Sequence, residues 1–197
     1  MMSIDTREAY RQALDAFGAL VHRIGPGQWR LPTPCVDWDV RTLVDHVVRE
    51  NRWVPLLLAG RTVGEVGDAL DGDMLGDDAL KAFDTSATAA VQAVFEDGAL
   101  ARVAHLSFGD VPGGEYVAEL FADVLIHTWD LARAVGADER LDPELVDACA
   151  AWFADAEKGY RQAGVIGEQR PTPAGTDAQT RLLAAWGRPP QPDGDDD

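Results

Sequence analysis

Residues 115–135 read EYVAELFADVLIHTWDLARAV, and this stretch decides the fold class. Apolar side chains recur every three or four residues, as on the buried face of an α-helix: Val117, Leu120, Phe121, Val124, Leu131 and Val135. Three further apolar residues widen that surface: Leu125, Ile126 and Trp129. Gly136 follows at a position typical of a helix end. We therefore predict that residues 115–135 form a long and deeply buried helix.

The same periodicity predicts further helices on both sides of this one. They lie at about 5–24, 38–59, Leu80 to Gly98, 143–163 and 178–186. Asp5 and Asp37 are expected to cap the first two. Residues 60–78 are rich in Gly and Asp and predict an acidic loop with at most one helical turn, whereas 101–114 predict an irregular or extended connection.

No segment alternates apolar and polar residues over the length of a strand, so the predicted class is all-α. Four helices of about 20 residues predict a four-helix bundle with an additional C-terminal helix and tail. We expect one domain over residues 1–190 and a disordered acidic tail over 191–197.

Composition indicates a soluble globular protein and excludes several partners. The chain has 197 residues, 46% of them hydrophobic, and a formal net charge of −17. This charge argues against nucleic acid and anionic membranes, which are bound through basic faces. The longest apolar run, at 53–59, is far shorter than the ~20 residues of a membrane span. The N-terminus has no signal-peptide pattern, so a cytoplasmic location with free Cys35 and Cys149 thiols is expected.

Candidate chemistry lies on histidines, because the common nucleotide-binding and serine-hydrolase motifs are absent from the sequence. Asp123 and His127 are four residues apart and share one helix face, so both side chains could reach one metal ion. His46 lies at the border of the apolar face of the 38–59 helix, with Glu50 one turn later. If the two borders face each other in the bundle, they make a three-ligand site.

Spacing alone leaves other interpretations open. Spacing alone favours a solvated helix face for the Asp123 and His127 pair and an ordinary border histidine for His46. His22 and His105 have no partner at chelating spacing and are interpreted as surface residues. Cys35 precedes a helix N-terminus, which can lower the pKa of a thiol, but a packing role is favoured for it.

Two stretches resemble a known family. Residues 33–48, TPCVDWDVRTLVDHVV, and residues 123–134, DVLIHTWDLARA, are similar to the two metal-site segments of the actinobacterial branch of the DinB/YfiT-like superfamily. That branch includes mycothiol-dependent maleylpyruvate isomerase. The tail at 177–188, DAQTRLLAAWGR, extends the resemblance to roughly residues 5–190.

The resemblance implies a four-helix bundle that binds one divalent metal ion. The ligand positions correspond to His46, Asp123 and His127 in this chain. The relative with known isomerase activity carries Glu where this chain has Asp123, which is one methylene shorter. The resemblance also implies a separate C-terminal domain in that relative, which this chain is expected to lack.

Two imidazoles and one carboxylate leave a coordination position open, as in catalytic zinc sites. We expect Zn²⁺, with Ni²⁺ as the alternative ion. The hypothesis is that mycothiol, a small thiol, binds there as cosubstrate and attacks a small electrophile, giving S-transfer or isomerisation. A noncatalytic metal-binding or ligand-sensing module and a metal-water hydrolase with Glu50 as base are the alternatives. A homodimer is left open.

Overall fold

The computed structural model describes residues 4–163, 166 and 168–188. The fold divides into two compact units, one formed by Asp5–Glu139 and the other containing the chain from Arg140 onward. The single domain expected over residues 1–190 stays a prediction. The acidic tail expected over 191–197 lies outside the described residues.

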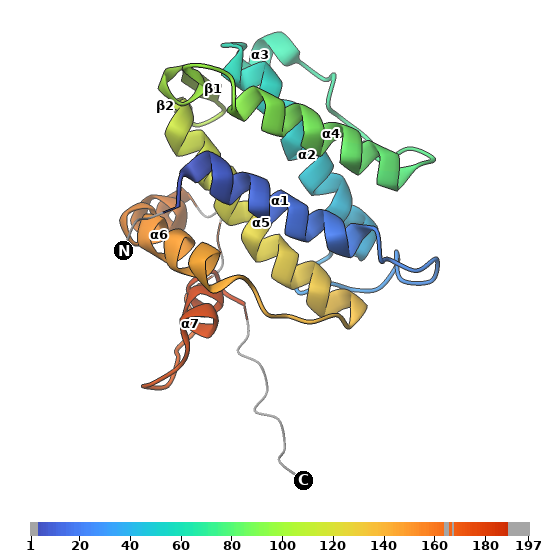
Figure 1. Cartoon of the computed structure of the whole chain (residues 1–197), viewed down its shortest axis with the longest axis vertical. Coiled ribbons are helices and arrows are strands. Elements are labelled where there is room, and N and C mark those ends of the chain that lie inside the picture. Colours follow the sequence, from blue (N-terminus) through green and yellow to red (C-terminus); the bar gives the residue numbers. More distant parts are fainter. Residues whose placement is uncertain (1–3, 164–165, 167, 189–197) are drawn as a thin grey trace. The chain divides into compact units, whose positions relative to one another are not determined.

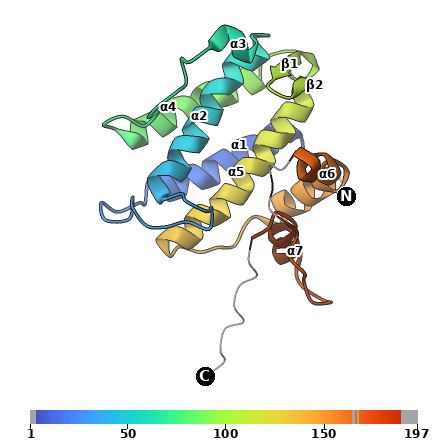
Figure 2. The same cartoon turned by 180° about the vertical axis from the view of Figure 1, so that it is seen from behind.

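Four long helices build the larger unit: α1 (Thr6–Val21), α2 (Val40–Leu58), α4 (Ala79–Val94) and α5 (Gly113–Val135). Helix α1 packs against α4 and α5, and α2 packs against the same two helices (Figures 1 and 2). The four apolar faces therefore meet in one core. The predicted all-α class and the four-helix bundle are confirmed.

The start of α2 differs from its prediction. Asp37 was expected to cap this helix, but the cap is Asp39, whose carboxylate accepts a hydrogen bond from the backbone N–H of Thr42 at 2.8 Å. Asp37 instead adopts a left-handed backbone conformation with φ of 66°. Asp tolerates this region better than most residues, so the chain turns there before the helix begins.

A small β-hairpin lies in the connection before α5, where no strand was expected. The 3₁₀ turn η1 (Ala99–Ala101) leads into β1 (Val103–Leu106), which pairs antiparallel with β2 (Gly109–Pro112). Four-residue strands are too short to display a clear alternation. Only the extended character of the connection could be read from the sequence.

The acidic segment at 60–78 is tied to the outer face of α2. It contains a single helical turn, α3 (Val63–Val66), as the sequence allowed. Arg41 donates hydrogen bonds to the Asp73 carboxylate at 2.8 Å and to the carbonyl of Gly76 at 3.1 Å. Asp73 is thus an anchor for the loop.

The C-terminal unit consists of α6 (Pro143–Ala163) and α7 (Ala178–Ala185), which pack against each other. Both helices were predicted, with boundaries within one residue or so of those observed. Phe153 and Trp186 stack with ring centroids 4.9 Å apart, and Arg161 donates to the carbonyl of Ala185 at 2.6 Å. Aromatic contacts and one cation therefore hold this pair together.

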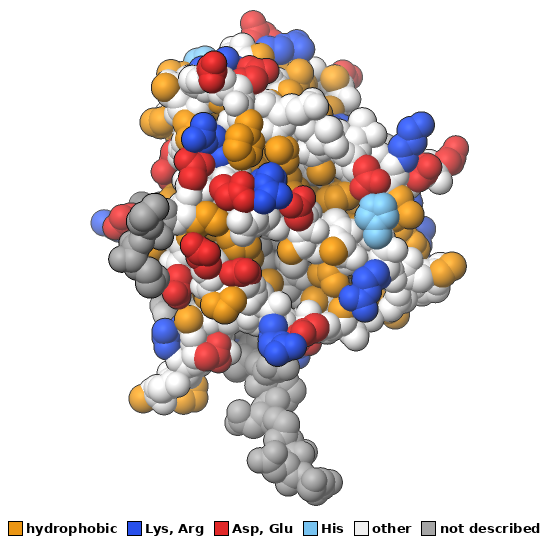
Figure 3. All heavy atoms as spheres, in the orientation of Figure 1, with side chains coloured by type: hydrophobic (Ala, Val, Ile, Leu, Met, Phe, Trp, Pro, Cys, Tyr) orange, Lys and Arg blue, Asp and Glu red, His pale blue; other side chains and the backbone are white. Residues whose placement is uncertain are grey.

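The surface carries paired charges. In the face seen in Figure 3, Lys and Arg side chains lie among acidic ones. Arg7, Arg11 and Arg102 each form an ion pair with a nearby carboxylate. Within the described part of the chain, no helix is both long and apolar enough to cross a membrane. The expectation that nucleic acid is not a partner stays a prediction.

The start of α5 should reject alanine at its first glycine and tolerate it at the next. A Cβ on Gly113 would lie 2.4 Å from the carbonyl oxygen of Ala99, whereas a Cβ on Gly114 would meet no atom closer than 3.6 Å. Gly113→Ala should lower the free energy of unfolding by roughly 2 kcal/mol. Gly114→Ala should be neutral or stabilising by up to about 1 kcal/mol, because Ala favours helix. Chemical denaturation measures both, and equal effects would contradict this packing.

Candidate metal centre

Helices α2 and α5 bring the three predicted ligands together inside the larger unit. His46 comes from α2, and Asp123 and His127 lie one turn apart on α5. The two Asp123 carboxylate oxygens face the two imidazoles, with 3.2 Å from Oδ1 to His127 Nε2 and 3.2 Å from Oδ2 to His46 Nε2. One donor atom from each residue lies within 4.8 Å of the others. The two helix borders thus face each other as the sequence suggested.

The spacing of these atoms fits a metal ion. In a tetrahedral zinc site with bonds of about 2.0–2.1 Å, neighbouring ligand atoms are about 3.3 Å apart. Each imidazole lies 3.2 Å from one of the two Asp123 oxygens, close to that value, and the full set of one donor atom per residue lies within 4.8 Å. In metal-free protein the same contacts are hydrogen bonds. Two imidazoles and a carboxylate could therefore hold either a proton or a divalent cation between them.

The electrostatics of the centre favour positive charge at its middle. Burial disfavours the ionised form of Asp123, but His127 and His46 attract the carboxylate and hold its pKa well below the usual range. Burial also disfavours protonated His127, yet Asp123 and hydrogen bonds to Asp123, Asp130 and Cys35 raise the pKa of that imidazole well above 6.5. Without a metal ion, these contacts therefore favour the protonated form of His127.

The other nitrogen of His127 meets a second pair of side chains. His127 Nδ1 lies 3.0 Å from Oδ2 of Asp130, a side chain with no exposed surface. The Cys35 Sγ lies 3.3 Å from the same oxygen and 3.8 Å from His127 Nδ1. This cluster is a second group that could hold an ion. The sequence favoured a packing role for Cys35 and assigned none to Asp130, so both contacts were missed.

A tight loop before α2 carries Cys35 and Trp38 to the centre. The backbone N–H of Thr33 donates to the carbonyl of Trp38 at 3.0 Å, and that of Trp38 donates to the carbonyl of Cys35 at 3.1 Å. The indole of Trp38 then lies against both imidazoles, with ring centroids 4.9 Å from His46 and 5.8 Å from His127. Trp38 therefore forms an aromatic wall of the centre.

A partly buried carboxyl group lies one turn beyond His46. Burial is the main cause that raises the pKa of Glu50, and repulsion from Asp123 adds to it. Its charge also raises the pKa of the buried phenol of Tyr116, although burial contributes most. A raised pKa makes a carboxyl group a better proton acceptor than an ordinary one. Glu50 is thus the candidate acid or base that spacing indicated.

The interior beside the centre contains a chain of buried polar groups. Tyr10 Oη donates to Asn51 Oδ1 at 2.9 Å, and Asn51 Nδ2 donates to Ser86 Oγ at 3.3 Å. Ser86 Oγ in turn donates to the carbonyl of Phe83. These bonds link α1, α2 and α4 across the core. They satisfy groups that would otherwise be costly to bury.

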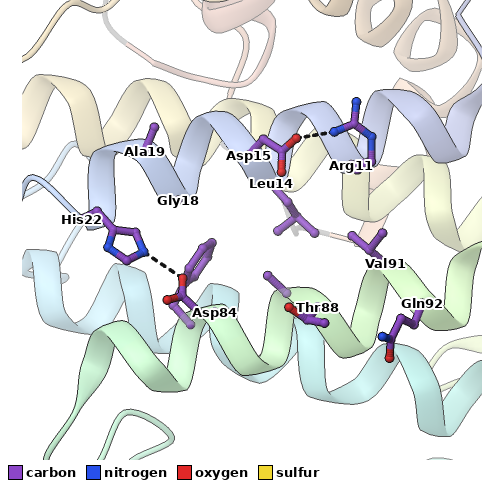
Figure 4. Close-up of a pocket in the computed structure, with 12 residues that line it drawn as sticks. Arg11, Leu14, Asp15, Gly18, Ala19, His22, Asp84, Thr88, Val91 and Gln92 are labelled. Atoms are coloured by element: carbon purple, nitrogen blue, oxygen red, sulfur yellow. Dashed lines mark hydrogen bonds and ion pairs between the residues drawn. The ribbon is translucent and has the colours of Figure 1, made fainter.

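His22 and His105 lie outside the centre, as expected for surface residues. His105 Nδ1 pairs with Asp110 at 2.7 Å in the hairpin. His22 Nε2 pairs with Asp84 at 2.8 Å across a groove between α1 and α4 (Figure 4). The groove has a volume of about 590 Å³ and an apolar floor that includes Leu14. It is formed by different helices from the ones that carry the candidate ligands.

Comparison with known proteins identifies the family. Residues 10–132 match the model of the mycothiol maleylpyruvate isomerase N-terminal domain. The chain belongs to this family. Two uncharacterized proteins of Mycobacterium tuberculosis, from strains CDC 1551 / Oshkosh and ATCC 25618 / H37Rv, are each 32% identical over 187 residues. The alignments cover 94% of this chain and 98% of each relative.

Solved structures of the isomerase share the fold. The chain is similar to the crystal structure of the mycothiol-dependent maleylpyruvate isomerase, with a TM-score of 0.66 and 16% identity, and to that of a histidine-to-alanine mutant, with 0.67 and 15%. Each match covers 93% of this chain and 88% of the solved chain. The alignment therefore spans most of the length of each solved chain, and the separate C-terminal domain expected in the isomerase stays a prediction.

In protein freed of metal by a chelator, the pKa of His127 should lie well above 6.5. The protonated imidazole then stabilises the fold fully below about pH 6.5, and this contribution is lost as the pH rises through the folded pKa. Asp123→Asn should lower the pKa of His127, because the cost of burying its positive charge then outweighs the remaining attraction. Imidazole ¹H–¹⁵N NMR measures the pKa of His127.

The matched control for this titration is Asp110→Asn. That change removes the partner of His105 in the hairpin and should leave the pKa of His127 unchanged. A His127 pKa at or below 6.5 in the metal-free wild type would contradict the charge balance of the centre.

Proposed function

We propose that this protein binds one divalent transition-metal ion through His46, Asp123 and His127 and uses mycothiol to act on a small electrophile, as a thiol S-transferase or isomerase. The observation that carries the proposal is the convergence of two imidazole nitrogens and a carboxylate on one point between α2 and α5. Zinc suits this mixed nitrogen and oxygen set in tetrahedral geometry, and Ni²⁺ is the alternative.

The charge of the ligand set supports a catalytic site. Neutral imidazoles and the Asp123 carboxylate together contribute one negative charge, so a divalent ion leaves a net positive charge at the centre. Three protein ligands also leave at least one position for an exogenous group. When bound, such an ion lowers the pKa of a coordinated thiol and so supplies a nucleophilic thiolate at neutral pH.

Mycothiol is proposed as the thiol on the basis of the family. The family model and both solved relatives bear mycothiol in their names. Addition of a thiol to a carbon–carbon double bond allows rotation about the resulting single bond, and loss of the same thiol restores the double bond. If the thiol adds and is not lost again, it stays bound to the electrophile as a thioether, which is S-transfer. A reduced thiol cosubstrate also fits a cytoplasmic location.

Two residues of the chain have proposed roles beside the ligands. Trp38 shields the imidazoles of His46 and His127 from water on one side and offers an apolar face to a bound molecule. Glu50, with its raised pKa, exchanges a proton with the thiol or with the electrophile. Both residues come from α2 or the loop that precedes it.

A metal-dependent hydrolase is the second candidate function. It is favoured by Glu50 alone, because a carboxyl group with a raised pKa near an ion can serve as general base toward water. Hydrolysis requires no thiol. Assays of the metal-loaded protein against electrophiles and esters, with and without mycothiol, separate the two reactions, and inactivity in all of them would indicate a noncatalytic metal protein.

The purified protein should contain up to one equivalent of divalent metal, and His46→Ala or His127→Ala should lose most of it. Either change leaves two protein ligands, which hold zinc poorly. Elemental analysis by mass spectrometry gives the metal content. His22→Ala and His105→Ala are matched controls, because each removes an imidazole paired with an exposed carboxylate outside the centre. Wild-type metal content in both ligand variants would show that the assignment is wrong.

In cobalt-substituted protein, mycothiol should produce a sulfur-to-metal charge-transfer band in the near-ultraviolet spectrum. An analogue with a blocked sulfur should not produce it. The measurement is made in a Cys35→Ser, Cys149→Ser background, so that no protein thiol supplies the sulfur. A spectrum unchanged at saturating mycothiol would rule out thiol chemistry at the ion and leave the hydrolase or the noncatalytic metal protein.

A further inference from the structure

We propose that Asp130 is a positioning residue for the metal centre, held in place by Cys35, and that this pair fixes the tautomer and orientation of His127. The inference deepens the proposed function and rests on it. Asp130 and Cys35 are 95 residues apart in the chain and meet at a single carboxylate oxygen, Oδ2 of Asp130.

The first step is the direction of the hydrogen bond between His127 and Asp130. An ionised carboxylate only accepts hydrogen bonds, so the proton in the 3.0 Å contact with Asp130 belongs to Nδ1 of His127. Nε2 of a neutral His127 then carries the lone pair. That lone pair faces Asp123 and, across it, His46. Asp130 thereby selects the one tautomer that can place a ligand atom at the proposed metal position.

The second step is the role of the Cys35 thiol. Its sulfur lies 3.3 Å from the oxygen that accepts from His127, so the S–H donates a second hydrogen bond to the same atom. The Asp130 side chain has no exposed surface. A buried carboxylate needs such donors, because its desolvation is otherwise costly. Cys35 therefore restrains Asp130, and Asp130 restrains His127.

The third step separates this arrangement from a rival one. Cys35, His127 and Asp130 could themselves hold an ion on the Nδ1 side of the ring. An ion at that position would take the Nδ1 lone pair of His127 and would leave Nε2 protonated. The two arrangements require opposite tautomers, so they exclude each other for a neutral imidazole. We assign the ion to the Nε2 side, where His46 adds a second imidazole.

The first test measures zinc affinity by competition with a chelating dye. Asp130→Ala should weaken zinc binding about 10- to 100-fold, the usual effect of losing such a partner of a metal-bound histidine. Asp130→Asn keeps an acceptor oxygen without the charge and should fall between Asp130→Ala and the wild type. Cys35→Ala should cost about two- to tenfold, the equivalent of one hydrogen bond. Cys35→Ser, which keeps a donor, should restore most of that loss.

Two control variants separate positioning from stability. Ser86→Ala removes a buried hydrogen bond on α4 and should lower the melting temperature without changing zinc affinity. Cys149→Ser removes the thiol in the C-terminal unit and should also leave zinc affinity unchanged. If Asp130→Ala does not fold, Asp130→Asn carries the comparison. A loss of zinc affinity that follows the melting temperature across all variants would overturn the positioning role.

The second test needs no bound metal. In chelator-treated wild type, ¹H–¹⁵N NMR should show a slowly exchanging Nδ1–H of His127, because Asp130 accepts its proton in a buried position. Asp130→Ala should abolish this resonance, and Cys35→Ala should speed its exchange with solvent. An absent Nδ1–H in the wild type, or one that persists in Asp130→Ala, would overturn the inference whether or not the protein binds metal.

The third test decides between the two ion positions. Cobalt-substituted wild type without added thiol should show no sulfur-to-metal charge-transfer band, because Cys35 is not a ligand. A band that disappears in Cys35→Ser would overturn the inference in favour of the Nδ1 position. Failure of zinc to bind the wild type at all would instead refute the proposed function, whereas normal binding with no effect of Asp130→Ala would refute only this inference.

Discussion

The contact of His127 with two carboxylates, Asp123 at Nε2 and Asp130 at Nδ1, is the interaction on which the candidate centre depends. Both acidic residues lie on α5, the helix with the largest share of buried positions in the bundle. Burying an ionised carboxylate costs roughly several kcal/mol of desolvation free energy unless a cation compensates its charge. In metal-free protein a protonated His127 would be that cation. A divalent ion at Nε2 would replace its proton and set two positive charges against the two carboxylates, which links metal binding to the stability of the core.

The remaining parts of the centre are arranged around this contact by α2 and the loop before it. Helix α2 begins only at Val40, after the left-handed turn at Asp37, and the delayed start leaves a short loop free to fold back on the bundle. That loop places Trp38 on two imidazoles and Cys35 on Asp130. Moving the helix start by a turn would displace both side chains while leaving His46 on its face.

The fold is shared with the mycothiol-dependent isomerase, but a bundle by itself carries no particular chemistry. The three candidate ligands and Glu50 are what would make this bundle a catalyst. Asp123 is one methylene shorter than the Glu expected from the resemblance, and here its two oxygens reach both imidazoles at 3.2 Å. The shorter side chain therefore still spans the gap between α2 and α5.

The sequence by itself determined the helices, because apolar spacing of three and four residues reports directly which face is buried. Spacing paired Asp123 with His127 and placed His46 at the border of its own helix, and the resemblance joined the three as one ligand set. The hairpin at 103–112 escaped notice because four-residue strands carry too little alternation. Cys35 and Trp38 could not be placed, since Asp130 and His127, which they meet, lie far along the chain on α5 and only tertiary packing brings them together. Local periodicity shows which face of a helix is buried. Which side chains contact that face is decided by the tertiary packing of segments that are distant in the sequence.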